Sequence, residues 1–296
     1  MSPTPLDFAT PTLADAARIC PIVATAQAMA NDLSFANIYL LRHKYQTTTA
    51  VEHGVLYRYY GGNSRLQGYA FPCGAEDVET ALQRIETDAT LRRRPLRFCL
   101  LTPQEAALLQ ALRPGRFTYT CDAGDSDYIY RQSDLSSLPG TAYLRKRNHI
   151  ARFEKLFPDW KFEILTPAHA EDALNIAREW LAACPGTALE HELHAIEHAL
   201  QHTAELGICG GLIYTGGRAV AMALASFVSP RVADVHYEKC LPGYREAYPV
   251  INRELARTLD CDWINREEDL NQPGLRLAKE SYHPALLLTK QSATPC

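Results

Sequence analysis

A short basic run in the second half of the chain has the composition of an anion site. The run covers residues 143–148 and opens a predicted helix, whose first two turns hold three cations and no acid. A free helix prefers acids at its N-terminus, so a bound anion would relieve the repulsion and accept hydrogen bonds from free backbone N–H groups. Arginine suits phosphate and carboxylate. The run therefore predicts binding of an anionic substrate by Tyr143, Arg145, Lys146, Arg147 and Asn148.

The alternative for this run is a solvated basic face whose arginine stems cover the core. Tyr143, Arg147, Ile150, Phe153 and Phe157 share one face at helical spacing, so Arg147 lies on an otherwise apolar stripe. An arginine in such a position needs a polar partner. We therefore favour the anion site.

A second charged cluster follows a predicted strand at residues 262–266, and α/β sheets commonly hold ligands at such strand ends. One helix later come a lysine, a tyrosine and a histidine, of which the last two can act as general acids. The alternative is an ordinary charged surface loop. On the first interpretation Glu267 is catalytic, and substrate is bound by Asn265, Arg266, Glu268, Lys279, Tyr282 and His283.

The predicted strand at residues 232–239 has one polar face. Asp234, His236 and Glu238 alternate with apolar residues and with Lys239. A carboxylate or imidazole on this face can take a proton from an attacking amine or hydroxyl, which makes Glu238 and His236 candidates for the catalytic base. The alternative is a row of side chains that faces solvent or pairs with Lys239 and Arg266.

Motifs for metals and common cofactors are missing from the sequence. His191, His194, His198 and His202 lie opposite the apolar face of their predicted helix, H-E-x-x-H is not matched, and we expect no metal. There is no G-x-G-x-x-G, no P-loop and no G-x-S-x-G. The nine cysteines form no C-x-x-C pair, which predicts reduced and mostly buried thiols.

The composition is that of a globular protein. The chain has 296 residues, of which 47% are hydrophobic and 22% charged, with room for two domains. A net charge of −4 argues against broad nucleic-acid binding but allows a local basic patch. The N-terminus has no signal-peptide pattern, and the longest apolar stretch, residues 219–228, is far below the roughly 20 residues of a membrane helix. We expect a soluble, cytoplasmic protein without an integral membrane segment.

The predicted elements follow the same order in both halves of the chain: two helices, three antiparallel strands, and then helix, strand, helix, strand. This is the order of the GCN5-related N-acetyltransferase fold. We predict an α/β protein with two tandem acetyltransferase-like domains and mixed sheets, at residues 1–135 and 136–296. The boundary is expected within 131–140, where Ser, Asp, Pro and Gly cluster. In that fold the strand at 232–239 splays from its neighbour, and the acyl group reacts in the gap.

Two motifs, G-x-x-Y-x-x-K-R-N at residues 140–148 and I-N-R-E-E-D-L at 264–270, carry a family resemblance. With the segments at 34–43 and 127–130, they resemble the phosphatidylglycerol lysyltransferase C-terminal-domain family over nearly the whole chain. The resemblance implies two fused acetyltransferase-like domains. It also implies transfer of an aminoacyl group from a charged tRNA, as membrane-bound relatives do to a lipid headgroup. The chain departs from the family at Thr141, where a lysine is usual, and lacks the transmembrane half of the lipid-modifying synthases.

The sequence thus leads to the hypothesis of an acyltransferase whose second domain holds the active cleft. Aminoacyl-tRNA is the expected donor, and an amine or hydroxyl of a lipid headgroup, peptide or small molecule is the acceptor. No cofactor is required, since the turn after Lys239 lacks the [QR]-x-x-G-x-[GA] cradle for coenzyme A. Two alternatives remain open at this point. One is an N-acyltransferase that uses acyl-CoA, and the other is a non-catalytic protein that binds RNA or an anionic ligand.

Overall fold

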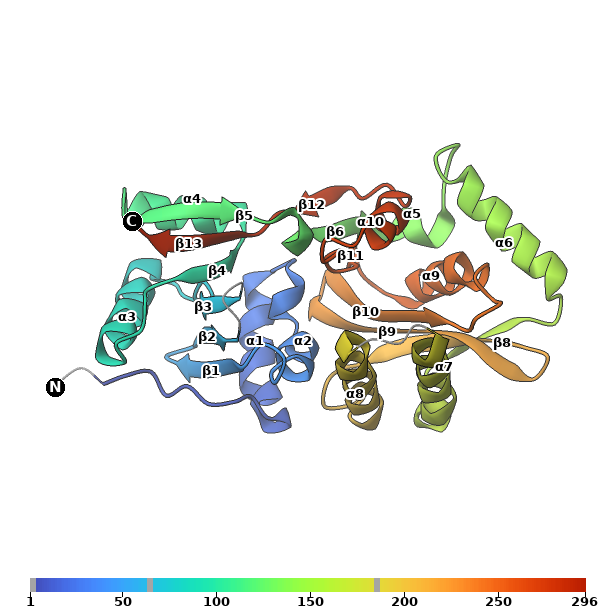
Figure 1. The fold of residues 1–296 in the computed structure, drawn as a ribbon, viewed down its shortest axis with the longest axis horizontal. Helices are drawn as coiled ribbons and strands as arrows, with labels where there is room; N and C mark the ends of the chain where they lie inside the picture. Colours follow the sequence, from blue (N-terminus) through green and yellow to red (C-terminus); the bar gives the residue numbers. More distant parts are fainter. Residues whose placement is uncertain (1–3, 63–65, 184–186) are drawn as a thin grey trace. The chain divides into compact units, whose positions relative to one another are not determined.

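The computed structural model describes residues 4–62, 66–183 and 187–296, and the chain divides into two compact units (Figure 1). Unit 1 comprises residues 1–127, 268–273 and 287–296. Unit 2 comprises residues 128–267 and 274–286. Each unit has its own mixed β-sheet and its own helices.

Unit 1 is built on a six-stranded sheet with the order β1-β2-β3-β4-β13-β5, in which only β3 and β4 pair in parallel. Its strands are β1 (Thr47–Glu52), β2 (Val55–Gly61), β3 (Gln67–Tyr69), β4 (Phe98–Leu101), β5 (Phe117–Cys121) and β13 (Gln291–Pro295). Its helices are α1 (Ala16–Ala26), α2 (Phe35–Leu40), α3 (Val78–Leu91) and α4 (Pro103–Leu112).

Local sequence signals explain where the helices of unit 1 begin. The Asp77 side chain accepts a hydrogen bond from the Thr80 N–H and caps α3. Thr102 and Glu105 form a capping box at α4, with a proline at the first helical position. Apolar residues of α3 and α4, including Leu82 and Leu109, pack with Tyr69 and other sheet residues into the main core of the unit.

Unit 2 is built on a seven-stranded sheet with the order β12-β6-β11-β10-β9-β8-β7. Its strands are β6 (Asp127–Arg131), β7 (Lys161–Ile164), β8 (Cys209–Thr215), β9 (Arg218–Ser229), β10 (Val232–Cys240), β11 (Trp263–Asn265) and β12 (Leu286–Leu288). Its helices are α5 (Gln132–Ser137), α6 (Leu144–Leu156), α7 (Ala170–Ala183), α8 (Thr187–Gln201), α9 (Ala247–Thr258) and α10 (Pro273–Glu280).

The alternation predicted for β10 separates the two faces of this sheet. The Lys239 Nζ lies 3.6 Å from the centre of the Trp180 ring on α7 and 2.8 Å from a Glu192 carboxylate oxygen on α8. Its neighbour Glu238 points the other way and accepts a hydrogen bond from Asn252 on α9. Helices α7 and α8 therefore cover one face of the sheet, and α9 packs on the other (Figure 1).

The expectation of an α/β protein with two acetyltransferase-like units and mixed sheets is confirmed. The two units are not continuous segments on either side of one boundary between residues 135 and 136, because two strands belong to the sheet of the other half of the chain. Strand β6 follows β5 in the chain but pairs with β11 in the sheet of unit 2. Strand β13, near the C-terminus, lies between β4 and β5 in the sheet of unit 1. The Ser-, Pro- and Gly-containing stretch at 131–140 is not simply a linker, because it includes α5.

Two further expectations concern the cysteines and the membrane. The eight cysteines of the described segments are free thiols, but only Cys73, Cys99 and Cys240 are buried, so the prediction of mostly buried thiols is wrong. Burial was expected because cysteine behaves as a small hydrophobe, whereas Cys20, Cys121 and Cys296 lie at the surface. Within the described ranges, every helix is too short or too polar to cross a lipid bilayer.

Candidate active site

The parallel pairing of β10 and β11 ends early, and charged side chains take over where it ends. Val232–Asp234 pair with Trp263–Asn265, but β10 continues to Cys240. Beyond this ladder, His236 and Glu238 of β10 contact the two residues that follow β11, which are Arg266 and Glu267. The structure thus brings together the two charged segments of unit 2 at the strand end where the sequence predicts the active site.

Glu238 and Arg266 form the central ion pair of this site. Each side chain is only 12% exposed, and the Asn252 Nδ2 donates a 2.9 Å hydrogen bond to the second Glu238 oxygen. Burial opposes the charge of Arg266, but Glu238 outweighs this cost and the pKa of the guanidinium is raised. Its Nε and Nη1 groups are buried and have no hydrogen-bond acceptor among the described residues. Arg266 therefore keeps N–H donors available for a bound group.

Tyrosine rings surround the guanidinium and connect it to Lys146. The Arg266 Cζ lies 4.8 Å from the centre of the Tyr282 ring and 5.7 Å from that of Tyr130. The Lys146 Nζ lies 3.7 Å from the Tyr282 ring centre and donates a 2.6 Å hydrogen bond to the Ser281 hydroxyl. Burial raises the pKa of both tyrosines, so both hydroxyls stay protonated at neutral pH.

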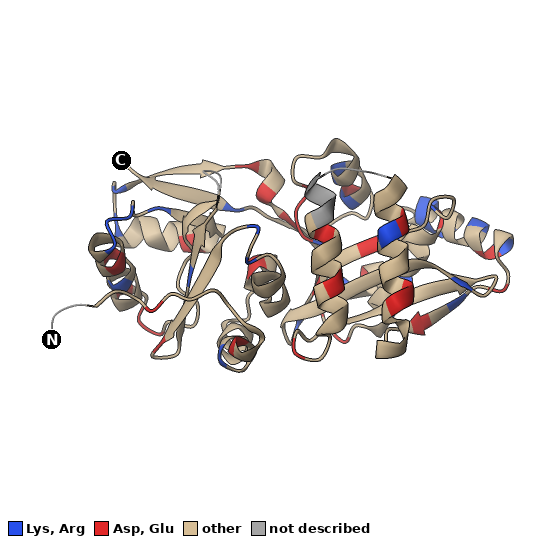
Figure 2. Ribbon diagram, turned by 60° about the horizontal axis from the view of Figure 1, so that its bottom comes forward, with Lys and Arg blue, Asp and Glu red and all other residues tan. Residues whose placement is uncertain are grey.

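The surroundings of Lys146 disfavour its positive charge. It lies on α6, whose charged residues are mainly basic (Figure 2). Burial, followed by repulsion from Arg266 and Arg145, lowers the pKa of Lys146 to about 8. An anion placed beside Lys146 and Arg266 would reduce that repulsion. The two residues provide the positive charge that the sequence predicts for an anionic substrate.

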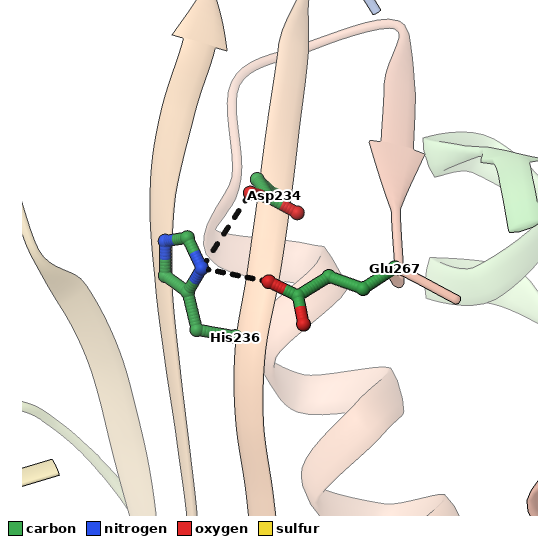
Figure 3. A group of neighbouring side chains, drawn as sticks. All are labelled: Asp234, His236 and Glu267. Atoms are coloured by element: carbon green, nitrogen blue, oxygen red, sulfur yellow. Dashed lines mark hydrogen bonds and ion pairs between the residues drawn. The ribbon is translucent and has the colours of Figure 1, made fainter. Parts of the chain in front are cut away.

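Elsewhere on β10, His236 lies between the carboxylates of Asp234 and Glu267 (Figure 3). A hydroxyl, that of Ser226, lies on its other side. Its Nδ1 is 3.1 Å from the Glu267 Oε1 and 3.5 Å from the Asp234 Oδ2, and its Nε2 is 2.8 Å from the Ser226 Oγ on β9. The imidazole is 3% exposed and Glu267 is 24% exposed. With a carboxylate beside Nδ1, the imidazole is oriented so that Nε2 can serve as a general base.

Backbone geometry holds Glu267 in place. The residue has φ of 57°, a left-handed conformation that non-glycine residues rarely adopt. The buried Asn265 side chain accepts a 2.6 Å hydrogen bond from the Glu267 N–H and supports this turn. The turn lets Arg266 and Glu267 meet different residues of β10.

The same three side chains, Asp234, His236 and Glu267, are the group with metal-ligand spacing in the described part of the chain. One ligand atom from each lies within 4.8 Å of the others, and imidazole with two carboxylates suits a divalent cation. The histidines of α8 do not belong to such a group in the described part of the chain. The sequence directed attention to α8 because its histidines are close in sequence, whereas this group comes from two strands.

Other predicted site residues hold the loops around the site. The Lys279 ammonium is buried and donates to the Arg266 carbonyl oxygen. The Tyr143 hydroxyl donates a 2.7 Å hydrogen bond to the Tyr282 carbonyl oxygen, and burial raises the pKa of Tyr143 to about 12. The exposed His283 ring packs edge-on against Tyr143, with ring centres 5.4 Å apart. These contacts fix the positions of Arg266 and Tyr282.

Four other predicted site residues are exposed or have partners away from the Glu238–Arg266 pair. Arg145 and Asn148 are exposed on α6. The Arg147 Nη1 donates to the carbonyl oxygens of Leu138 and Gly140, so its partner is the backbone before α6. Glu268 belongs to unit 1, where it accepts a 2.8 Å hydrogen bond from Asn31.

The sequence analysis did not select Tyr130, Ser226, Asp234 or Asn252 as site residues. Ser226 has a sequence signal as a polar residue within the otherwise apolar run 219–228, and Asn252 follows the apolar residues 249–251. Both are nearly fully buried, so each needs a polar partner, and these partners are His236 and Glu238. Tyr130 has no such signal, since a tyrosine in a buried strand is ordinary core material.

Comparisons with known proteins identify the relatives of this chain. The family model described as "Phosphatidylglycerol lysyltransferase, C-terminal" matches residues 24–294. A conserved protein of unknown function from Bacteroides thetaiotaomicron is 33% identical, with a TM-score of 0.92, and the match covers 98% of this chain and 100% of that one. A search of curated protein sequences gave no match.

Two more distant structures share the fold. The C-terminal domain of a putative lysylphosphatidylglycerol synthetase from Agrobacterium fabrum is 14% identical, with a TM-score of 0.66 and coverage of 96% of this chain and 92% of that one. L-PGS from Bacillus licheniformis is 13% identical, with a TM-score of 0.67 and coverage of 94% and 91%. At these identities the likeness extends to the fold alone.

Proposed function

This chain belongs to the phosphatidylglycerol lysyltransferase C-terminal family, and from that premise we propose that it is an aminoacyltransferase. Unit 2 would transfer an aminoacyl group from aminoacyl-tRNA to an amine or hydroxyl acceptor. The acceptor would be a lipid headgroup, a peptide or a small molecule that carries such a group. A reaction that uses tRNA would take place in the cytoplasm.

The observation that carries this proposal is the buried Glu238–Arg266 pair beside Lys146. The acceptor nitrogen or oxygen attacks the ester carbonyl carbon, and its proton passes to Glu238 or His236. Charge then develops on the carbonyl oxygen, where the spare N–H groups of Arg266 and the Lys146 ammonium can stabilise it. When the ester C–O bond breaks, the ribose oxygen of the tRNA leaves and takes up a proton, for which Tyr282 is a candidate donor.

The turn between β10 and α9 favours a donor without coenzyme A. The Leu241 N–H donates a 2.9 Å hydrogen bond to the Val220 carbonyl oxygen. The Tyr244 N–H donates a 3.0 Å hydrogen bond to the Leu241 carbonyl oxygen. The N–H of Ala247, the first residue of α9, donates to the Tyr244 carbonyl oxygen at 2.8 Å. An acyl-CoA enzyme would need amides of this turn for the pyrophosphate, and these three are already used within the protein.

The test is transfer of a labelled amino acid from aminoacyl-tRNA by the full chain. Removing one stabilising donor of the oxyanion typically costs about a hundredfold in rate, so we expect a loss of this order for Lys146→Ala. Loss of a general base costs about a hundredfold or more, so we expect at least such a loss for Glu238→Gln. Lys155→Ala is the matched control, because it removes an exposed lysine from the same helix. Unchanged rates in both site variants would remove these roles.

Two other outcomes would replace the proposal. Binding of coenzyme A in calorimetry, together with acyl transfer from acyl-CoA, would establish the acyl-CoA alternative. RNA binding with a steep salt dependence and without turnover would indicate a non-catalytic protein.

A further inference from the structure

Unit 1 contains a cavity of about 260 Å³ that is lined only by residues of this unit. Its walls come from α2 and the turn that follows it, from the sheet face with Tyr60 and Leu100, and from the segments around Glu268 and Lys290. The volume suits a ligand about the size of an amino acid. The cavity is far from uniform, since apolar and charged residues line different parts of it.

The charged part of the wall is a buried network of ion pairs. The Lys290 ammonium is 3% exposed and lies 2.7 Å from an Asp127 oxygen and 3.3 Å from the Asp32 Oδ1. Arg58, also 3% exposed, donates a 2.6 Å hydrogen bond to the other Asp32 oxygen. Glu268 joins the network through the Asn31 side chain, which bonds to both Glu268 and Lys290.

Acids outnumber the buried bases in this network. Three carboxylates line the cavity, those of Asp32, Asp125 and Glu268, and a fourth, Asp127, pairs with Lys290; the buried cations are Arg58 and Lys290. The one further base on the wall, Lys44, is exposed to solvent. Burial, with a contribution from Glu268, raises the pKa of Asp127 to about 6 although Lys290 lies beside it. The cavity therefore carries an excess of negative charge.

One carboxylate oxygen at the cavity wall has an incomplete set of contacts. The Asp32 Oδ1 is buried and lies 3.3 Å from the Lys290 ammonium, which it shares with Asp127, and it makes no well-aligned hydrogen bond among the described residues. A buried carboxylate oxygen normally accepts at least one hydrogen bond. A donor that enters the cavity could supply it.

We propose that this cavity binds a small molecule with a primary ammonium group on a short aliphatic chain. The ammonium would lie against Asp32 and Glu268, and the chain against Ile38, Leu41 and Leu100. An anion would meet the excess negative charge, and a neutral molecule would leave it unbalanced. This binding site lies in unit 1 and does not depend on the reaction proposed for unit 2.

The experiment is calorimetric titration of the full chain with three probes of equal length: n-pentylamine, n-pentanol and n-pentanoate. Saturable binding of the amine is expected. A charge-assisted hydrogen bond separates the amine from the alcohol, so we expect n-pentanol to bind about tenfold or more weakly. No binding of n-pentanoate is expected. Equal binding of the three probes, or tighter binding of the pentanoate, would overturn the proposal.

Three variants test whether the amine binds in this cavity or elsewhere on the protein. Glu268→Gln keeps the side-chain size and an oxygen for Asn31, removes one charge, and should weaken amine binding about tenfold without changing alcohol binding. Glu76→Gln makes the same change at an exposed position of unit 1 outside this cavity and should change neither. Leu41→Phe fills the apolar part and should weaken both probes. Amine binding that survives Glu268→Gln in a folded protein contradicts the site.

Discussion

The carboxylate of Glu238 and the guanidinium of Arg266 form an ion pair just beyond the point where β10 and β11 stop pairing. Each side chain is 12% exposed, so the pair is largely withdrawn from water. Removing charges from water is costly, and in this site the cost is offset by mutual attraction and by the Asn252 hydrogen bond to Glu238. The site therefore holds a charged pair at a place where continued strand pairing would have given an apolar core.

Breaking this pair from one side should destabilise unit 2 strongly. Arg266→Met leaves Glu238 buried without its counter-charge, and such losses are about 3–5 kcal/mol. The double variant Glu238→Gln, Arg266→Met removes both charges and should be more stable than Arg266→Met alone. Urea unfolding of the four proteins of this cycle measures the difference. If the two substitutions were simply additive, the pair would not be coupled and this account of the site would fail.

The activity should fall as pH rises through the pKa of Lys146, which is lowered to about 8. Lys146 is cationic below this value and neutral above it, so binding of an anionic donor weakens on the alkaline side. The measurement is KM for aminoacyl-tRNA as a function of pH. In Lys146→Arg the alkaline limb should move beyond the measured range, because arginine stays charged. A limb that stays in place in this variant would have to come from another group.

His236 should contribute to the rate more than to donor binding. His236→Gln removes the imidazole that touches Glu267 and Ser226, and loss of a general base costs about a hundredfold or more in kcat. Ser226→Ala removes only the hydroxyl at Nε2 and should have a much smaller effect. Single-turnover rates and donor affinity separate the two effects. A rise in KM with unchanged kcat would make His236 a structural residue.

The strand that carries these residues could be predicted because its sequence alternates. Glu238 and Lys239 point to opposite sides of β10, as expected from a period of two, but a register shift between Val235 and Tyr237 interrupts the alternation at His236. The meeting of this face with Arg266 and Glu267 follows from the order of elements. The reason is that β11 runs parallel to β10 and ends beside Asp234, so the residues that follow β11 lie along the remaining part of β10.

Other features could not be read from the sequence. Arg147 needs a polar partner on an apolar face, but the sequence does not distinguish a bound anion from the backbone carbonyls of Leu138 and Gly140, which are its partners in the structure. Strand β13 is short and ends in a proline, and its place between β4 and β5 depends on pairing with distant segments. Such long-range pairing leaves no local pattern.

In unit 1, Lys290 should be a main source of stability. Lys290→Met leaves Asp32 and Asp127 with only part of their counter-charge, and a loss of about 3–5 kcal/mol is expected above pH 6. The pKa of Asp127 is already raised to about 6, so this group favours the folded state increasingly as pH falls from about 6 toward its unfolded value of 3.8. Without Lys290 the pKa of Asp127 rises further, and the pKa of Asp32, which burial raises but Lys290 and Arg58 together lower, rises as well, so protonation relieves the buried charge. The loss should therefore be smaller at about pH 5 than at about pH 7.5 in urea unfolding.

The control is Lys155→Met, which replaces an exposed lysine and should change the free energy of unfolding by less than about 0.5 kcal/mol at either pH. An equal loss at both pH values would mean that Lys290 stabilises unit 1 by packing and not by its charge.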